Sequence, residues 1–203
     1  MTIKEQILSV LEQNKGKSVS GEQLANMLFC SRNAVWKAVK ALQNEGYAIE
    51  AVTKKGYCLS EENTILSPQS VEPYLEFPLR ILTVPEVDST NNELKKMAEA
   101  GEPEGTVLVA NRQTGGKGRM GRQFFSPGDS GLYMSVLLRP KLSAEDALLI
   151  TTAAAVAVAK AIEALSGKKA GIKWVNDIFV DGKKVCGILT EAAVDFESGG
   201  LQY

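Results

Sequence analysis

Residues 20–59 read SGEQLANMLFCSRNAVWKAVKALQNEGYAIEAVTKKGYCL, and the periodicity of this stretch changes once, at Gly46. Before Gly46, apolar residues recur at helical spacing behind two serines, Ser20 and Ser31, that are typical helix N-caps. A tight turn at residues 29–30 separates the two helical patterns. The segment therefore predicts two short helices joined by a turn, the second of them ending at Gly46.

After Gly46 the pattern becomes that of a hairpin. Residues 47–51 and 57–59 alternate between apolar and polar side chains around a turn at residues 53–56. Upstream, residues 3–11 repeat apolar side chains at helical spacing. Three helices followed by a basic-tipped hairpin are the order of a winged helix-turn-helix, and we expect this DNA-binding domain to span residues 1–62.

The charges favour the same interpretation. Residues 1–60 hold eight Lys or Arg against five Glu, a balance of +3, whereas the remaining 143 residues carry 15 basic and 19 acidic groups, a balance of −4. A basic segment on an acidic body suggests that this part meets an anionic partner. The DNA-binding candidates lie at the start of the recognition helix and on the hairpin tip: Ser31, Arg32, Asn33, Lys37, Lys40, Lys54 and Lys55.

Composition excludes several chemistries. The chain has no histidine, which removes Ser-His and Cys-His nucleophile systems, His-ligated zinc and imidazole acid–base catalysis. Its three cysteines are odd in number and lack CxxC spacing, so we expect them to be reduced in a cytoplasmic protein. The N-terminus shows no signal peptide pattern. The most apolar stretch, residues 147–159, is shorter than the roughly 20 residues of a membrane span, so we predict a buried helix and no membrane partner.

A proline-containing linker with at most one short helix is expected over residues 63–79, before a second domain at residues 80–203. In that domain the patterns predict strands at 81–84, 106–110, 132–138, 171–175, 178–180 and 185–191, with helices at 91–100 and 145–165. Consecutive hairpins with inserted helices indicate an α+β domain built on a mixed sheet.

The segment QTGGKGRMGR, residues 113–122, is the most informative part of this domain. Its four glycines let the backbone approach a ligand closely, and its three cations suit a carboxylate or a phosphate. It formally matches GxGxxG, but a strand follows where a dinucleotide fold needs a helix, and no Walker A lysine is present. On composition alone, a solvated basic loop remains the alternative.

Three further segments carry polar residues in unusual places. Alternation puts Lys173, Val175 and Asp177 on one face of an apolar strand, which predicts a cleft, with a solvated edge strand as the alternative. Lys184 immediately precedes a strand that Gly187 interrupts; taken alone, it fits an exposed hairpin lysine. Residues 88–91, DSTN, form a helix N-cap, which also suits polar or anionic ligand groups.

Together, and in this order, the four segments resemble the biotin protein ligases, and with the winged helix the resemblance covers essentially the whole chain. It is closest to the bifunctional ligase–repressor subgroup. The resemblance implies that biotin and ATP, the latter with Mg²⁺, give biotinyl-5′-adenylate and pyrophosphate, and that biotin then passes to a lysine of a biotin carboxyl-carrier protein of acetyl-CoA carboxylase. It also implies operator DNA as a partner and a homodimer when biotinyl-adenylate is bound.

The resemblance also assigns roles to residues. It implies that the ureido and thiophene ends of biotin are held by Ser89, Thr90, Asn91 and Gln113, and that the biotin tail is covered by Lys117, Gly118 and Arg119 with the adenylate-loop residues Gly115, Gly116 and Arg122. It implies that Lys184 contacts the biotin carboxylate and the α-phosphate, and that the Gly187 backbone faces biotin. The residues implied to lie near the nucleotide and its Mg²⁺ are Lys173, Asn176 and Asp177. No protein metal site is assigned. Two anions must meet here, so Lys184 and Arg119 are the expected catalytic cations.

Some features depart from the family pattern. Lys117 stands where many members have Arg, Met120 where some have Arg, and Val175 where many have Pro. Family members continue beyond a strand resembling residues 201–203 into more of the sheet and a C-terminal barrel, so we expect this catalytic domain to be incomplete. Two alternatives stay open: a non-catalytic biotin-sensing regulator of transcription, and a lipoate-protein ligase.

Overall fold

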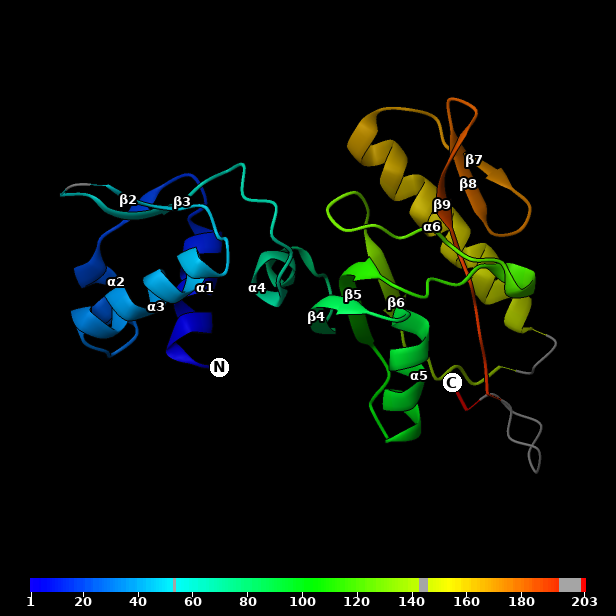
Figure 1. Cartoon of the computed structure of the whole chain (residues 1–203), viewed down its shortest axis with the longest axis horizontal. Coiled ribbons are helices and arrows are strands. Elements are labelled where there is room, and N and C mark those ends of the chain that lie inside the picture. The colour runs from blue at the N-terminus through cyan, green and yellow to red at the C-terminus, as the bar shows by residue number, and fades with distance from the viewer. Residues whose placement is uncertain (53, 143–145, 194–201) are drawn as a thin grey trace. The chain divides into compact units, whose positions relative to one another are not determined.

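Three helices and a small antiparallel sheet form the first unit of the chain, residues 1–83, in a computed structural model (Figure 1). The structure describes residues 1–52, 54–142, 146–193 and 202–203. The elements are α1 (Ile3–Gln13), β1 (Ser18–Val19), α2 (Gly21–Met27), α3 (Arg32–Asn44), β2 (Ile49–Val52) and β3 (Gly56–Leu59), and the strand order is β1-β3-β2. This confirms the predicted three helices and hairpin.

Capping serines and apolar faces explain why these helices form. The hydroxyls of Ser20 and Ser31 accept hydrogen bonds from the backbone amides of Gln23 and Ala34, both at 3.1 Å. Their inward faces meet in one core, whose fully buried members are Ile7, Leu11, Leu24, Val35, Val39, Leu42 and Leu59. The two residues of β1 pair with Cys58 and Tyr57 of β3, and they are too few for any periodicity to predict.

The hairpin turn depends on backbone conformations with positive φ, which glycine adopts most easily. Lys54 and Gly56 have φ values of 63° and 114°, and a Cβ on Gly56 would overlap the carbonyl oxygen of Val19. Thr53, the first residue of the predicted turn, lies outside the described residues.

Residues 63–79, predicted as a linker, hold α4 (Pro68–Val71) and the 3₁₀ turn η1 (Glu72–Tyr74). Helix α4 contacts α1, and the side chains of Ser67 and Gln69 are buried. The segment is thus part of the first unit. The exact extents of the predicted domains stay a prediction.

In the described residues, the second unit contains two three-stranded sheets and two long helices, and its first strand begins at Arg80, four residues before the boundary between the units. One sheet has the order β4-β5-β6, made of β4 (Arg80–Val87), β5 (Thr106–Gln113) and β6 (Tyr133–Val136), and the other has the order β7-β8-β9, made of β7 (Gly171–Lys173), β8 (Asp177–Val180) and β9 (Lys183–Gly187). Helix α5 (Thr90–Glu99) follows β4, the short 3₁₀ turn η2 (Arg119–Gly121) follows β5, and α6 (Ala147–Ser166) precedes β7 (Figure 1). Helices and strands occur in the predicted α+β order.

Three predicted strands are too long. The strand predicted at 132–138 covers only Tyr133–Val136, the one predicted at 171–175 ends at Lys173, and the one predicted at 185–191 ends at Gly187. Residues 174–176 instead form a turn, so Lys173 and Asp177 face each other across a hairpin and do not share one face of a strand with Val175. The Asp181-Gly182 hairpin is confirmed, with φ values of 50° and 74° at its two residues.

Helix α6 is only partly buried, contrary to the prediction for residues 147–159. Ala155 and Ala159 pack against Ile178 of β8, whereas Leu149 and Leu165 are 62% and 91% exposed. Its residues Leu149–Ser166 are long and apolar enough to cross a membrane by length and composition, with a mean hydropathy of 1.6, and 17% of them are buried. The prediction failed because, among the described elements, the sheet β7-β8-β9 covers one face of the helix and leaves the residues of the other face exposed.

Candidate ligand site

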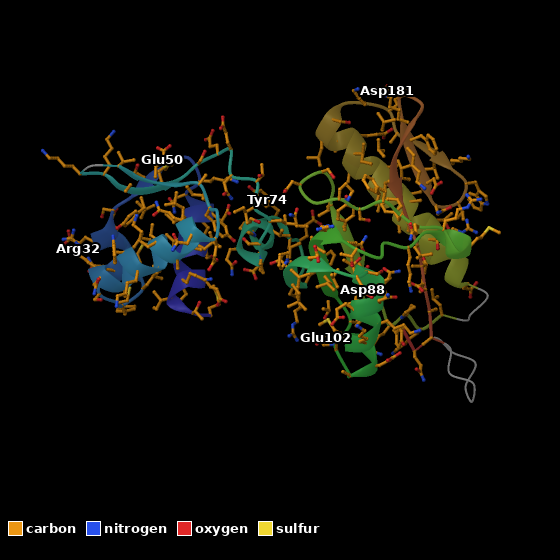
Figure 2. The ribbon with its side chains drawn as sticks, in the orientation of Figure 1. Arg32, Glu50, Tyr74, Asp88, Glu102 and Asp181 are labelled. Atoms are coloured by element: carbon orange, nitrogen blue, oxygen red, sulfur yellow. The ribbon has the colours of Figure 1, made fainter. Side chains whose placement is uncertain are left out.

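A cavity of about 530 Å³ in the second unit gathers residues from three of the four segments singled out above. The head of α5 and the end of β5 supply polar groups, and the strand β9 supplies the backbone of Gly187. The sequence-predicted residues that line it are Ser89, Thr90, Asn91, Gln113, Lys117 and Gly187. Figure 2 shows Asp88 where the chain enters α5.

A hydrogen-bond network fixes the polar end of the cavity. The backbone amide and the hydroxyl of Thr90 both donate to Gln113 Oε1, at 2.8 and 3.1 Å. Gln113 Nε2 then donates to Ser126 Oγ at 3.0 Å, which sets the orientation of its amide. Thr90 is buried, so these bonds are sheltered from water.

Ser126 and Ser135 belong to this network, although the sequence did not single them out. The hydroxyl of Ser135 lies 2.8 Å from that of Thr90 and is also hydrogen-bonded to Asn91 Oδ1. The amide nitrogen of Asn91 donates to the carbonyl of Leu189 at 3.2 Å and to Glu191 at 2.9 Å. The sequence marks Ser135 in one way: it is a polar residue within the largely apolar strand predicted at 132–138.

The glycine-rich loop lines a smaller cavity of about 410 Å³, bounded by residues 115–123 with Leu189 and Glu191. Two backbone bonds hold the loop: Gly118 N donates to Arg122 O at 2.7 Å, and Phe124 N donates to Gly116 O at 2.8 Å. A Cβ on Gly116 would overlap the carbonyl oxygen of Phe124 and lie 2.5 Å from Ser126 Oγ. The loop itself contains a single 3₁₀ turn, η2, and the next regular element is the strand β6, which agrees with rejecting a dinucleotide fold.

Three cations of the site are each held by a polar partner. Lys117 Nζ donates to Asn92 Oδ1 at 2.5 Å, and Arg119 donates to Asn176 Oδ1 at 3.0 Å. Lys184 Nζ lies 2.8 Å from Asp177 Oδ1 and 5.8 Å from the centroid of the Phe124 ring. Arg119 and Lys184 belong to one cluster, because Asn176, the partner of Arg119, also donates through its amide nitrogen to Asp177, the partner of Lys184, at 3.0 Å.

Lys184 adjoins the larger cavity through Gly187. A Cβ at Gly187 would lie 3.2 Å from Lys184 Nζ and 3.2 Å from the Phe124 ring, so a side chain there would push the lysine or the ring aside by a few tenths of an ångström. Lys173 is not part of the cluster: it is exposed, and its ammonium lies 5.8 Å from the Phe179 ring centroid.

The pKa values of two groups near the cavity are shifted in opposite directions. The hydrogen bond from Asn92, followed by the backbone amide of Ser89, lowers the pKa of Asp88 below its usual value. Burial raises the pKa of the Cys186 thiol, which lines the cavity. Cys186 is a free thiol, as are Cys30 and Cys58. Within the described residues, no group of three or more Asp, Glu, Cys or His side chains could hold a metal ion.

The DNA-binding candidates lie in the first unit. Ser31 caps α3, and its neighbours Arg32, Asn33, Lys37 and Lys40 are exposed on that helix. Lys54 and Lys55 are exposed at the hairpin between β2 and β3.

Comparison with known proteins places the second unit in a family. The model of the Biotin/lipoate A/B protein ligase family matches residues 84–196, more than half of the chain. The chain belongs to this family. An HTH domain model also matches residues 4–58, so this member of the biotin/lipoate ligases joins a helix-turn-helix to its ligase unit.

Its relatives include proteins that carry both parts. The chain is 38% identical to "Bifunctional ligase/repressor BirA" of Bacillus spizizenii and 37% identical to that of Bacillus subtilis, in each case over 94% of this chain and 59% of the relative. The chain thus spans about 59% of the length of these relatives. A solved structure, a biotin protein ligase from Aquifex aeolicus in complex with biotin and ATP, is 37% identical over 55% of this chain and 46% of that chain, with a TM-score of 0.47.

Proposed function

We propose that this biotin/lipoate ligase makes biotinyl-5′-adenylate from biotin and ATP, transfers the biotin to a lysine of a carrier protein, and represses transcription in response to biotin. The observation that carries the proposal is the cavity with Thr90, Asn91 and Gln113 at its polar end and Lys117 and Gly187 beside it. A cationic loop, residues 115–122, lies next to this cavity.

The lining of the cavity favours biotin over lipoate. Its hydroxyls and amides provide both donors and acceptors, which suits a ureido group with two N–H donors and one carbonyl. A dithiolane ring offers no such partner and would gain none of these hydrogen bonds, which favours biotin. The remaining lining includes Leu94, Leu137 and Val158, which suit the apolar ring and tail.

Adenylation requires two anions to meet. A carboxylate oxygen of biotin attacks the α-phosphorus, the bond from that phosphorus to the bridging oxygen breaks, and pyrophosphate leaves. Lys184 and Arg119, now paired with Asp177 and Asn176, would turn to these oxygens and stabilise the negative charge on the reacting phosphoryl group. The substrate itself is the nucleophile, which is compatible with a chain that lacks histidine.

Mg²⁺ would accompany the triphosphate and neutralise part of its charge. Magnesium takes most of its ligands from phosphates and water and needs only one or two carboxylates. Asp177, with the neighbouring Asn176 amide, is the group of this cluster that fits that part. Lys173 contacts Phe179 and lies outside this cluster, but it is opposite Asp177 across the hairpin, and its contact with the nucleotide stays a proposal on that basis.

The transfer step and the repressor role need macromolecular partners. The amine of a carrier lysine attacks the acyl carbon of the adenylate, and AMP leaves; the biotin carboxyl-carrier protein of acetyl-CoA carboxylase is the proposed acceptor. Operator DNA is the proposed partner of the first unit, bound by a homodimer of the adenylate-loaded protein in the cytoplasm. No membrane partner is proposed.

One assay separates this function from its alternatives. The protein is incubated with radiolabelled biotin, ATP, Mg²⁺ and a biotin carboxyl-carrier domain, and in parallel with labelled lipoate. We expect label on the carrier from biotin alone. Binding of biotin without transfer would favour a sensor of biotin without turnover, and preference for lipoate would favour a lipoate-protein ligase.

A further inference from the structure

Trp36 is a large aromatic side chain that α3 leaves 51% exposed. The helix otherwise separates its residues clearly, since Val35, Val39 and Leu42 are at most 1% exposed while its charged residues face solvent. Trp36 is an exception to this separation of buried apolar and exposed charged residues, because its large indole is exposed. Trp36 was not among the DNA-binding candidates from the sequence.

The neighbours of Trp36 on the helix surface are cations. Arg32, Trp36 and Lys40 follow one another at intervals of four residues, so they form a row along one flank of α3. All three are exposed. Figure 2 shows Arg32 at the start of this helix, at the outer edge of the first unit.

The charge of α3 points to an anionic partner. The helix contains no Asp or Glu, and no acidic residue lies in its first turn, where the helix dipole favours one. Arg32 lies in that turn instead, against the dipole. A partner rich in negative charge would offset this arrangement, and the exposed indole needs an apolar group on that same partner.

Duplex DNA offers both chemistries. Phosphates meet the cations and position the helix, and the major groove exposes the methyl group of thymine, the one apolar group on its base edges. We propose that Trp36 reads sequence by contacting a thymine methyl, with Arg32 and Lys40 on either side holding phosphates. The inference rests on the proposed binding of the first unit to operator DNA.

The test uses duplexes selected from a random pool by the full chain in the presence of biotin and ATP. In the best duplex, each thymine is replaced in turn by deoxyuridine, which removes only the methyl group. For the wild type we expect a loss of affinity of about fourfold at one or two positions, the effect of exposing one buried methyl group. Trp36→Ala should lose this sensitivity, and its salt dependence should match that of the wild type, because no phosphate contact is removed.

Two controls define the outcome. Tyr74→Ala removes another exposed aromatic ring of the same unit, 84% exposed on η1, and should keep the full deoxyuridine effect. Lys40→Ala should lower the slope of log affinity against log salt by about 0.9 for each protomer, or about 1.8 for the dimer. An equal deoxyuridine effect in Trp36→Ala and wild type would overturn the inference while leaving DNA binding intact. Failure to select any duplex would overturn the proposed DNA binding and this inference with it.

A second measurement does not depend on the stability of Trp36→Ala. The chain has two tryptophans, so in Trp174→Phe the fluorescence comes from Trp36 alone. Addition of the selected duplex should reduce the quenching of Trp36 by acrylamide severalfold. Unchanged quenching at saturating duplex would contradict a contact between Trp36 and DNA.

Discussion

Lys184 lies in an ion pair with Asp177, and the two side chains are 41% and 24% exposed. An ion pair this open to water is worth little for stability, so replacing Lys184 should leave the fold intact. We predict that Lys184→Ala lowers the rate of adenylate formation by at least about a hundredfold, the usual effect of removing one group that stabilises transition-state charge. The measurement is pyrophosphate release with biotin and ATP.

Lys183→Ala is the matched control, because Lys183 is the exposed neighbour on the same strand and has no place in the cluster. It should keep most of the activity. Full activity of Lys184→Ala would remove this residue from the catalytic role.

Asn92 connects the loop to α5. Its amide donates to Asp88 Oδ2 at 2.8 Å and its oxygen accepts from Lys117 at 2.5 Å, so Asp88 turns the oxygen toward the cation. We predict that Asn92→Ala speeds trypsin cleavage after Lys117, Arg119 and Arg122 by about threefold to tenfold in the ligand-free protein, the effect of losing one hydrogen bond. Mass spectrometry of the fragments gives the rates.

The control for Asn92→Ala lies on the same helix. Lys96 pairs with Glu93 within α5, at 2.9 Å, and makes no contact with the loop, so Lys96→Ala should leave the cleavage rate unchanged. Equal rates in wild type and Asn92→Ala would show that the bond to Lys117 does not hold the loop.

At the scale of residues, the sequence predicted several groups that the structure brings to the cavity and missed those that bind them. Gln113 could be singled out because it begins a glycine-rich loop, whereas Lys184 was assigned through the family resemblance. Ser126 and Ser135 could not, because a hydroxyl in a loop or a strand is common and its partners come from distant parts of the chain. Lys173 was assigned to the site, and the structure places it against Phe179, away from the cluster.

Among the described elements of the second unit, the loop of residues 113–122 makes the sharpest demand on a glycine. Gly116→Ala would force a methyl group onto the carbonyl of Phe124, whereas at Gly118 the nearest atom, Arg122 O, would be 3.4 Å from it. We predict that Gly116→Ala slows adenylate formation by about a hundredfold, because the loop and Gln113 must shift. Gly118→Ala should slow it severalfold at most, and equal effects of the two substitutions would contradict this account.

Helix α1 buries a carboxylate. The side chain of Glu12 is 5% exposed, its Oε1 has no hydrogen-bond partner, and Lys15 lies 3.9 Å from Oε2. Burial raises the pKa of Glu12 above its ordinary value of 4.5, and Lys15 opposes this only in part. The protonated form therefore favours folding; its stabilisation is complete below the unfolded pKa and is lost as pH rises through the folded pKa.

Glu12→Gln should consequently raise the free energy of unfolding at pH 7, by about 1 kcal/mol. The gain should shrink toward zero near pH 4, where Glu12 of the wild type is protonated in both states. Urea unfolding of variant and wild type at both pH values measures the difference. A gain that is the same at pH 4 and pH 7 would refute the assignment to this carboxylate.

The strand errors have a physical cause at this scale. Alternation of side chains predicts a strand but cannot tell where its hydrogen bonds stop. Residues 174–176 continue the alternation while Asn176 turns the chain and its amide bonds to the carbonyl of Ile188 at 3.1 Å. Helix ends were predicted better, because capping serines mark them in the sequence itself.

For the whole molecule, the proposed function links ligand and DNA. One winged helix makes few phosphate contacts, so useful operator affinity needs two copies on a two-part site. We predict that biotin plus ATP raises operator affinity, because biotinyl-adenylate orders the loop of residues 113–122 and strengthens dimerisation. Binding isotherms on a selected duplex, with and without biotin and ATP, measure the effect.

Lys184→Ala provides the matching control, since without adenylate formation the added ligands should leave operator affinity nearly unchanged. By thermodynamic linkage, operator DNA should in turn favour the dimer. Operator affinity that does not respond to biotin and ATP in the wild type would contradict the link between the two units.

The bonds of Asn91 to Leu189 and Glu191 join parts of the chain 98 and 100 residues apart. In the first unit, the bonds of Lys4 to Glu45 and of Lys15 to Asn63 span only 41 and 48 residues. Closing the longer loop has the larger entropy cost and slows folding. During synthesis, the helix-turn-helix unit can therefore fold well before the ribosome delivers the residues that complete the cavity, so a nascent chain can form the proposed DNA-binding surface before the proposed biotin site.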